Sequence, residues 1–308
     1  MLSPSQNRVI DPILSNVVQG YVHPEHVGHN LFPTVPVMTA GGKVIEFDKS
    51  AFRLYNTGRA PGTAFKRAQF GHEGKPFALE NHGLEAPVPR EHMRDASVVP
   101  GINLASRAVN LVMSSTGLIL EKQQADLARN AANYDANHKV TLSGTSQWSD
   151  KANSDPIGDV KAAKEAVRST VGVYPNTMEI SATAYNALSE HPDILDKIKH
   201  TQRGVATPEL LAAIFDLDTV VIGKAIAFND DDTAIDVWGN DVVLAYVPSN
   251  PSGMEQPSYG YTYTLEGHPS VEVPYWEETT KSWIYGVANE RAPVLSGITS
   301  GFLIVDAV

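Results

Sequence analysis

Hydrophobic positions recur at helical spacing in two long segments of the chain. Between residues 103 and 134 proline is absent and apolar residues recur near every third or fourth position, which predicts one long helix. Residues 114–117, Ser-Ser-Thr-Gly, are poor helix formers and predict a bend or break there. In the second segment, Asp155 and Pro156 have the sequence of an N-cap followed by a first-turn proline. Gly172 stands where that helix should end.

The next part of the chain mixes strand and helix signals. Residues 177–180 predict a short strand, followed by a helix that begins at Ser181 or Thr183. The pair His191–Pro192 interrupts that helix, because proline cannot continue a helical hydrogen-bond ladder. Another helix is predicted to start at Thr207–Pro208 and to run through the sequence ELLAAIF.

Strand patterns of two kinds fill most of the remainder. The segments TVVIG and DVVLAYV are apolar at successive positions, as in strands buried on both faces. The segments KVIEFD and SYGYTYTLEG alternate apolar and polar residues, as in half-buried strands. Further candidates are SVEVPY, SWIYGVA and FLIVDAV, so the C-terminal part is expected to close the fold with a sheet.

The first 95 residues lack this periodicity. Residues 1–40 contain five prolines and scattered apolar residues, and we expect an extended arm that lies on another surface. Residues 41–95 are rich in Gly, Pro, His and charge, which predicts a long projecting hairpin or loop without helix. Its segment RAPGTAFKRAQFGHEGKPFAL is basic, and three interpretations stay open: a lid over an active site, an arm for nucleic acid, or an arm for another subunit.

Composition and charge narrow the class of protein. Hydrophobic residues make up 42% and charged residues 19%, as in a folded globular protein. With 35 acidic and 24 basic residues the formal charge is −11, which disfavours a dedicated nucleic-acid binder. The chain has no cysteine, so disulfides, thiolate metal sites and thiol catalysis are excluded. No signal-peptide pattern or long apolar run is present, and we expect a soluble protein made in a cytosol.

The candidate motifs for cofactor and metal binding lack residues that such sites require. In GHEGKP the earlier glycine that a phosphate-binding loop requires is Gln69, and no Ser or Thr follows the lysine. His23, His26 and His29 are spaced by three, but the intervening Pro and Gly disfavour the helix that would align them as metal ligands. We therefore interpret these histidines as part of a polar turn and predict no metal site.

Acidic clusters give no catalytic site either. Residues 230–232 are three aspartates, but the loop lacks the ligand order of a calcium site and is expected to be a solvated turn. Glu277 and Glu278 are adjacent on a predicted strand and should point to opposite faces, which argues against a shared acid–base pair. We predict no catalytic, cofactor-binding or metal-binding residue. A protein made of long helices, extended arms and sheets is more typical of an assembly protein than of an enzyme.

The order of these elements resembles the major capsid proteins of tailed bacteriophages. The most specific part is VYPNTMEISATAYNALSEHPDILDKIKHTQRGVATPELLAAIFDLDTVVIGKAIAF, and the closing WIYGVANERAPVLSGITSGFLIVDAV is also similar to that family. The resemblance implies an α+β fold of the Hong Kong phage type, shared with encapsulins. It has an N-terminal arm, an extended E-loop hairpin, a long spine helix, a peripheral domain and an axial domain.

The resemblance also implies boundaries. We expect an N-terminal arm over residues 1–40, the E-loop region over 41–95 and a peripheral domain with the spine helix over 96–150. A mainly axial domain should follow over 151–255, and strands over 256–308 should return to the peripheral domain. No enzymatic activity and no cofactor are implied.

The implied function is a structural protein that self-assembles into hexamers and pentamers of an icosahedral phage head enclosing double-stranded DNA. The implied partners are other copies of the chain, a separate scaffolding protein, a portal and a decoration protein, with DNA held only non-specifically and no membrane. Assembly is expected in the bacterial cytoplasm, and the finished location is the virion. The alternatives are an encapsulin-like compartment shell and a cytosolic enzyme with an unrecognised site.

Under this resemblance the basic segment is the E-loop. Its cationic side chains are candidates to contact acidic surface on an adjacent subunit: Arg59, Lys66, Arg67 and Lys75. Exposed ion pairs contribute only about 0 to 1 kcal/mol each, so strand pairing and repetition over the shell are expected to supply most of the binding free energy.

Overall fold

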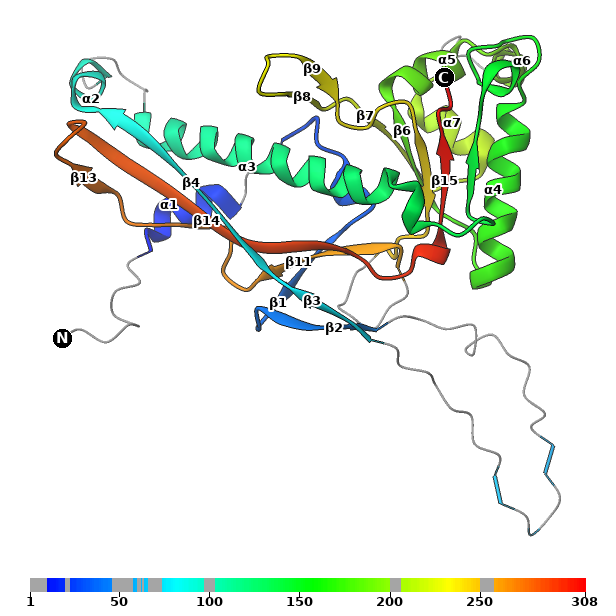
Figure 1. Ribbon diagram of the computed structural model, residues 1–308, viewed down its shortest axis with the longest axis horizontal. Coiled ribbons are helices and arrows are strands. Elements are labelled where there is room, and N and C mark those ends of the chain that lie inside the picture. The colour runs from blue at the N-terminus through cyan, green and yellow to red at the C-terminus, as the bar shows by residue number, and fades with distance from the viewer. Residues whose placement is uncertain are drawn as a thin grey trace.

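A computed structural model describes residues 10–19, 23–45, 58–59, 62, 64–65, 74–96, 103–199, 206–249 and 258–308. Figure 1 shows an elongated body in which a long helix, α3 (Leu104–Arg129), lies along a long sheet, and a globule of helices around a second sheet forms one end. Short 3-10 turns occur at Gly28–Asn30, Ala131–Asn133, Gly144–Ser146 and Ile298–Ser300.

The long sheet is organised around one strand, β14 (Ser282–Leu295). β4 (Glu80–Pro89) pairs with it antiparallel along the whole of β4, and β11 (Gly260–Leu265) pairs with its other end. β1 (Thr34–Val37) extends this sheet by pairing parallel to β11. The remaining strands on β14 are β12 (Ser270–Val271) and β13 (Tyr275–Glu277).

α3 packs against one face of the long sheet. Val109 and Val112 of α3 are buried in one apolar cluster with Val88 of β4 and Val287 of β14. Burial of each such side chain contributes about 1.5 to 3 kcal/mol. The same cluster includes Val18 of α1 (Pro12–Gln19), so the N-terminal helix is fixed to this layer.

The second sheet has five strands in the order β5-β15-β10-β6-β7. The strands are β5 (Lys139–Thr141), β6 (Thr177–Ser181), β7 (Thr219–Gly223), β10 (Val242–Ala245) and β15 (Gly301–Val305). The helices packed with it are α4 (Pro156–Val171), α5 (Ala182–Ser189), α6 (Pro192–Ile198) and α7 (Pro208–Phe215). A separate hairpin of β8 (Ile226–Phe228) and β9 (Ala234–Asp236) extends from this end of the molecule (Figure 1).

Burial of β10 on both faces confirms the prediction from DVVLAYV. Val242 and Leu244 lie in the helix-covered core, whereas Val243 and Ala245 lie in a second cluster shared with the end of α3. Because side chains alternate along a strand, β10 joins the two cores of the molecule.

The long helix is confirmed, but the predicted break is wrong. Asn103 caps α3 by accepting a hydrogen bond from the Ser106 backbone N–H at 3.2 Å. The helix then continues through residues 114–117 without interruption. Ser115 and Thr116 donate their hydroxyls to the carbonyls of the preceding turn, which satisfies the polar groups that would otherwise favour a break.

The predicted ends of α4 are confirmed. Asp155 accepts a hydrogen bond from the Gly158 N–H at 2.8 Å, Pro156 is the first helical residue, and Gly172 has the left-handed φ of 80°. The interruption at residues 191–192 is also confirmed, since His191 is the N-cap of α6.

The N-terminal third contains helices that its periodicity did not predict. α1 lies within the expected arm, and α2 (Arg90–Ala96) lies within the segment expected to lack helix. Leu31 and Phe32 are fully buried under β11, so part of the expected arm belongs to the core of its own chain. β2 (Gly41–Ile45) confirms the start of the strand in KVIEFD, and it pairs antiparallel with β3 (Gly74–Ala78).

Candidate assembly surfaces

The predicted contact residues lie in the sequence from the end of β2 to the first residues of β3. Figure 1 shows the β2–β3 ribbon on the side of the long sheet away from α3. Lys75 lies in β3, whereas Lys66 and Arg67 lie outside the described residues. Arg59 is exposed, and its guanidinium carbon lies 4.4 Å from the ring centroid of Phe65, a cation–π contact. Phe65 is 80% exposed, so this pair offers an aromatic ring and a cation to a partner.

An apolar groove of about 780 Å³ lies between β4 and α3. Leu84 of β4 and Leu111 of α3 line it, and they are 43% and 64% exposed. Among the strands that the structure describes, β4 pairs with β14 alone, so its other edge is unpaired. Exposed apolar grooves of this kind are typical of protein–protein interfaces.

The β8–β9 hairpin is a second exposed apolar element. Ile226 and Phe228 are 53% and 71% exposed. The turn is closed by hydrogen bonds from the Asn229 N–H to the Thr233 carbonyl and from the Asp232 N–H to the Asn229 carbonyl, both 3.0 Å. Asp232 has the left-handed φ of 58°, so the aspartates form a tight hairpin turn, as the sequence predicted.

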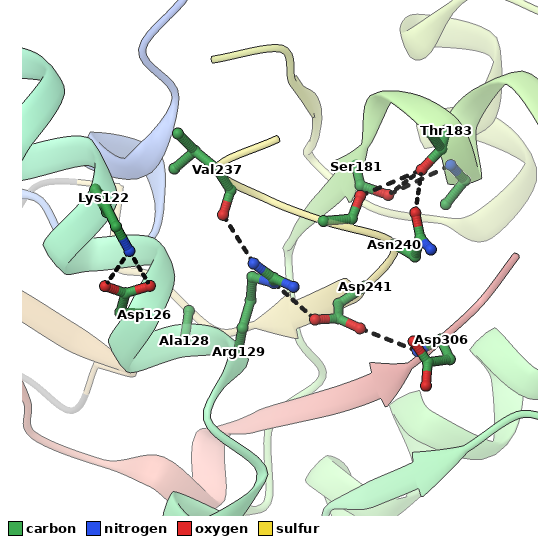
Figure 2. Close-up of polar contacts among 12 residues, drawn as sticks. Lys122, Asp126, Ala128, Arg129, Ser181, Thr183, Val237, Asn240, Asp241 and Asp306 are labelled. Carbon is green, nitrogen blue, oxygen red and sulfur yellow. Dashed lines mark hydrogen bonds and ion pairs between the residues drawn. The ribbon is translucent and has the colours of Figure 1, made fainter. Parts of the chain in front are cut away.

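An ion pair connects the end of α3 to the five-stranded sheet (Figure 2). Arg129 donates from Nε to Asp241 Oδ2 at 2.7 Å and from Nη1 to the Val237 carbonyl at 2.9 Å. The other Asp241 oxygen accepts from the Asp306 N–H at 3.0 Å. Gly239 has a φ of 55°, and a Cβ there would collide with the Arg129 guanidinium. The long helix, β10 and the chain after β15 therefore meet in one bonded unit.

Glu121 connects the N-terminal segment to the same region. Its buried carboxylate accepts backbone N–H bonds from Val27 and Gly28, each at 2.9 Å, and the Trp238 indole N–H at 2.8 Å. Three donors compensate for the loss of water around this charge.

Glu179, on β6, is a buried carboxyl group that lacks, within the described part of the chain, the hydrogen-bond donors that Glu121 has. It is fully buried, and neither carboxylate oxygen meets hydrogen-bond geometry with any described residue. Burial, and next the negative charge of Glu121, raise the pKa of Glu179 well above its usual value. The nearby Arg129 charge and the Gly223 N–H oppose this shift without reversing it. Burial in this core therefore favours the neutral form of the carboxyl group.

The remaining candidate motifs have structural partners. His23 and His26 stack with ring centroids 4.3 Å apart. Glu277 accepts from the Thr280 hydroxyl, whereas Glu278 binds Lys281 and the Trp276 indole, so the two glutamates belong to separate contacts. Within the described residues no group of three or more His, Cys, Asp or Glu side chains could hold a metal ion. No described helix is both long and apolar enough to span a membrane.

Sequence reasoning missed the groove beside β4 and the ion pair at Asp241. β4 contains Gly83, Pro87 and Pro89, which weaken a strand signal, and its pairing with β14 joins residues far apart in the chain. Asp241 and Arg129 are also distant in sequence, and only the fold brings them together. No local pattern identifies either feature.

Comparison with known proteins gives one consistent result. A family described as phage major capsid protein E matches residues 113–283. The major capsid protein of Burkholderia phage BcepMu is 36% identical over 305 residues, which cover 97% of each chain. The crystal structure of a phage-related protein from Bordetella bronchiseptica is 46% identical, covers 97% of this chain and 98% of its own, and superposes with a TM-score of 0.82.

More distant structures show the fold alone. The capsid of cyanophage P-SCSP1u is 9% identical with a TM-score of 0.60, covering 93% of this chain and 90% of its own. The SrpI encapsulin of Synechococcus elongatus is 12% identical with a TM-score of 0.55, covering 93% and 89%. Phage shells and an encapsulin shell therefore share this architecture, and the expected α+β capsid fold is confirmed.

Proposed function

The chain belongs to the family of phage major capsid proteins, and on that premise we propose how it builds and uses a shell. It is a structural protein of the virion that assembles with other copies of itself. The observation that carries the proposal is the fold match over 97% of the chain together with its exposed elements, the β2–β3 ribbon, the β4 groove and the β8–β9 hairpin. We propose that these elements form the contacts between copies in hexamers and pentamers.

Closed shells require contacts between different surfaces of identical subunits. Head-to-tail contacts of this kind close into rings when the rotation between subunits allows it. The ribbon lies on one side of the elongated body, and the hairpin extends near the globular end (Figure 1). Such separated contact surfaces suit a subunit that must touch several neighbours at once.

The boundaries of the parts follow from the same proposal. We assign residues 1–40 to the N-terminal arm, 41–95 to the E-loop region and 96–150 to the peripheral domain with α3 as its spine helix. Residues 151–255 form mainly the axial domain, and the strands from residue 256 return to the peripheral domain. The exceptions are β5 and β15, which pair within the five-stranded sheet and so belong with the axial part. The Arg129–Asp241 ion pair then lies where the spine helix meets the axial domain.

The net charge of the chain bears on what the shell encloses. The formal charge of −11 disfavours tight phosphate binding, which suits a wall that encloses double-stranded DNA without holding it. We propose that a separate scaffolding protein, a portal and a decoration protein complete the particle, and that assembly takes place in the host cytoplasm. The relative named as a major capsid protein favours a phage head over an encapsulin compartment.

The test is assembly after removal of the loop tip. Replacing about Gly62 to Gly74 by a short glycine linker should leave a folded subunit that forms few or no shells in negative-stain microscopy. Alanine at Arg59, Lys66, Arg67 and Lys75 should weaken assembly less, because exposed ion pairs contribute only about 0 to 1 kcal/mol each.

A matched control separates this effect from a general change in charge. Lys151 and Lys199 are exposed cations of the helical globule, and replacing both by alanine should leave shells unchanged. Normal shells from the tip deletion would contradict the assigned role of the loop. A purified wild-type protein that remains a small oligomer under all assembly conditions would instead support the enzyme alternative.

A further inference from the structure

A pocket of about 500 Å³ lies between residues 18–19 and 23–34, α3 and the long sheet, and shares no lining residue with the groove beside β4. Its wall combines one arginine, one asparagine and four histidines: His23, His26, His29, His268, Asn289 and Arg291. The capsid function assigns no role to this concentration of polar and cationic groups.

Arg291 is the distinctive member of this wall. It lies on β14, is 3% exposed, and donates from Nη2 to the Thr116 carbonyl at 2.6 Å. Its Nε has no hydrogen-bond partner among the described residues, and no described carboxylate forms an ion pair with it. Burial lowers the pKa of Arg291 to about 10, so the guanidinium remains charged at pH 7. A buried cation without a counter-charge is costly, which indicates that an anion belongs beside it.

Asn289 also has a buried polar atom that lacks a hydrogen-bond partner among the described residues. It is two residues before Arg291 on β14 and therefore on the same face of the sheet. It is 8% exposed, and its Oδ1 has no hydrogen-bond partner among the described residues. A carboxamide can accept from the hydroxyl of a protonated oxyanion, or donate to an oxyanion when its N and O exchange places.

No carboxylate among the described lining residues is bonded to Arg291. Glu121 is the carboxylate in the wall, but both its oxygens already accept from Val27, Gly28 and Trp238. Burial lowers the pKa of His26, so this imidazole is mainly neutral at pH 7 and can still donate one N–H. The wall therefore holds a carboxylate and a guanidinium that are not bonded to each other, and the Nε of Arg291 has no partner among the described residues.

We propose that this pocket binds a small oxyanion, a phosphate or a carboxylate, with Arg291 supplying the charge and Asn289 a hydrogen bond. Two sources could supply the same chemistry: inorganic phosphate from solution, or a carboxylate side chain of a second copy in the shell. A guanidinium suits either, because its fork of N–H donors matches the paired oxygens of these groups.

The experiment titrates unassembled subunits with inorganic phosphate by isothermal titration calorimetry. Ionic strength is kept constant, and chloride is the reference anion. Wild-type protein should show saturable binding of phosphate that is stronger than binding of chloride. Arg291→Met should weaken phosphate binding at least about tenfold, as expected for loss of a charge-assisted hydrogen bond. Arg90→Met, at an exposed arginine on α2, should bind like the wild type.

Further variants keep the test decisive if Arg291→Met does not fold. Asn289→Ala should then weaken phosphate binding, and a map of the protein with selenate should show the anion beside Arg291. Equal phosphate affinity in the wild type and the folded Arg291 or Asn289 variant would overturn the proposal. Binding of phosphate no stronger than that of chloride would also overturn it.

Assembled shells distinguish the two sources. Shells that still bind phosphate support a soluble anion. Shells that no longer bind it, with a neighbour's carboxylate beside Arg291 in the shell map, support the same site filled by a second copy. Shell formation is scored separately by microscopy, so a failure to bind phosphate would leave the capsid function unaffected.

Discussion

At the scale of single residues, Lys164 is a buried cation that backbone carbonyls satisfy. Its Nζ donates to the carbonyls of Phe215 and Asp216, at 2.5 and 2.7 Å, where α7 ends. The last carbonyls of a helix lack intrahelical donors, so this lysine of α4 caps the C-terminus of α7.

Lys164→Met should therefore destabilise the subunit although it places an apolar side chain in the core. The two carbonyls lose their donor, and the free energy of unfolding is expected to fall by about 1 to 3 kcal/mol. Urea denaturation followed by circular dichroism measures this change. Lys161→Met, at an exposed position of the same helix, is the control and should have no effect. Equal stability of the Lys164 variant and the wild type would show that solvent replaces the lysine at no cost.

Glu179 gives a prediction about pH. Its folded-state pKa is raised by burial, whereas the unfolded carboxyl titrates near pH 4.3. As pH rises above about 4.3, the unfolded state loses its proton first, so stability falls until pH passes the raised folded pKa. Glu179→Gln cannot ionise and should be more stable than the wild type at pH 7, with little difference below pH 4.

Thermal unfolding between pH 4 and pH 8 measures this difference. A gain of about 1 kcal/mol corresponds to roughly 1.5 °C in the melting temperature of a 308-residue chain. Glu165→Gln, at an exposed carboxylate of α4, should not reproduce the effect. A Glu179→Gln protein with the same pH dependence as the wild type would contradict the neutral state of this group.

At the scale of elements, local signals predicted the structure wherever the cause of an element is local. Asp155 and Pro156 marked the start of α4 because the cap and the fixed proline φ act within one turn. The same pair occurs at Asp11 and Pro12, where Asp11 accepts from the Leu14 N–H at 3.0 Å, and it could have predicted α1. The weak periodicity of the first 40 residues indicates an extended arm instead and conceals this local signal.

Elements with non-local causes were less predictable. β4 exists because ten of its residues pair with β14, about 200 positions later in the chain. The groove beside β4 depends on that pairing and on the packing of α3, so no segment read alone could show it. The pocket at Arg291 is hidden for the same reason, since its wall comes from several distant segments.

The contact between α3 and the five-stranded sheet gives a prediction at this scale. Asp241 is 5% exposed and faces Arg129. Arg129→Ala should cost about 3 to 5 kcal/mol of unfolding free energy, because it leaves a buried carboxylate without its cation. Asp241→Asn in the same background should restore part of this loss, since the buried charge is then removed. Urea denaturation of both single variants and the double variant measures the coupling, and purely additive effects would contradict it.

At the scale of the whole molecule, the chain combines a firmly packed body with elements that have few contacts of their own. β11 lies in the interior, with Tyr261 and Tyr263 buried between β1, β14 and Phe77. The β2–β3 ribbon is a sheet of two strands, and such a pair is only marginally stable in water. Such a subunit can fold before assembly, and its ribbon is then stabilised when it contacts a neighbouring subunit.

Hydrogen exchange tests this division of stability. In free subunits the amides of β11 should exchange slowly, and those of β2 and β3 should exchange faster, because the ribbon has only two strands and Phe77 is its buried aromatic contact with the body. In assembled shells the ribbon amides should slow at least about tenfold, which corresponds to about 1.4 kcal/mol of added protection. β11 should change little and serves as the internal reference within each sample. Equal protection of the ribbon before and after assembly would mean that it is already stable alone, and that the shell is held together by the groove beside β4 and the β8–β9 hairpin instead.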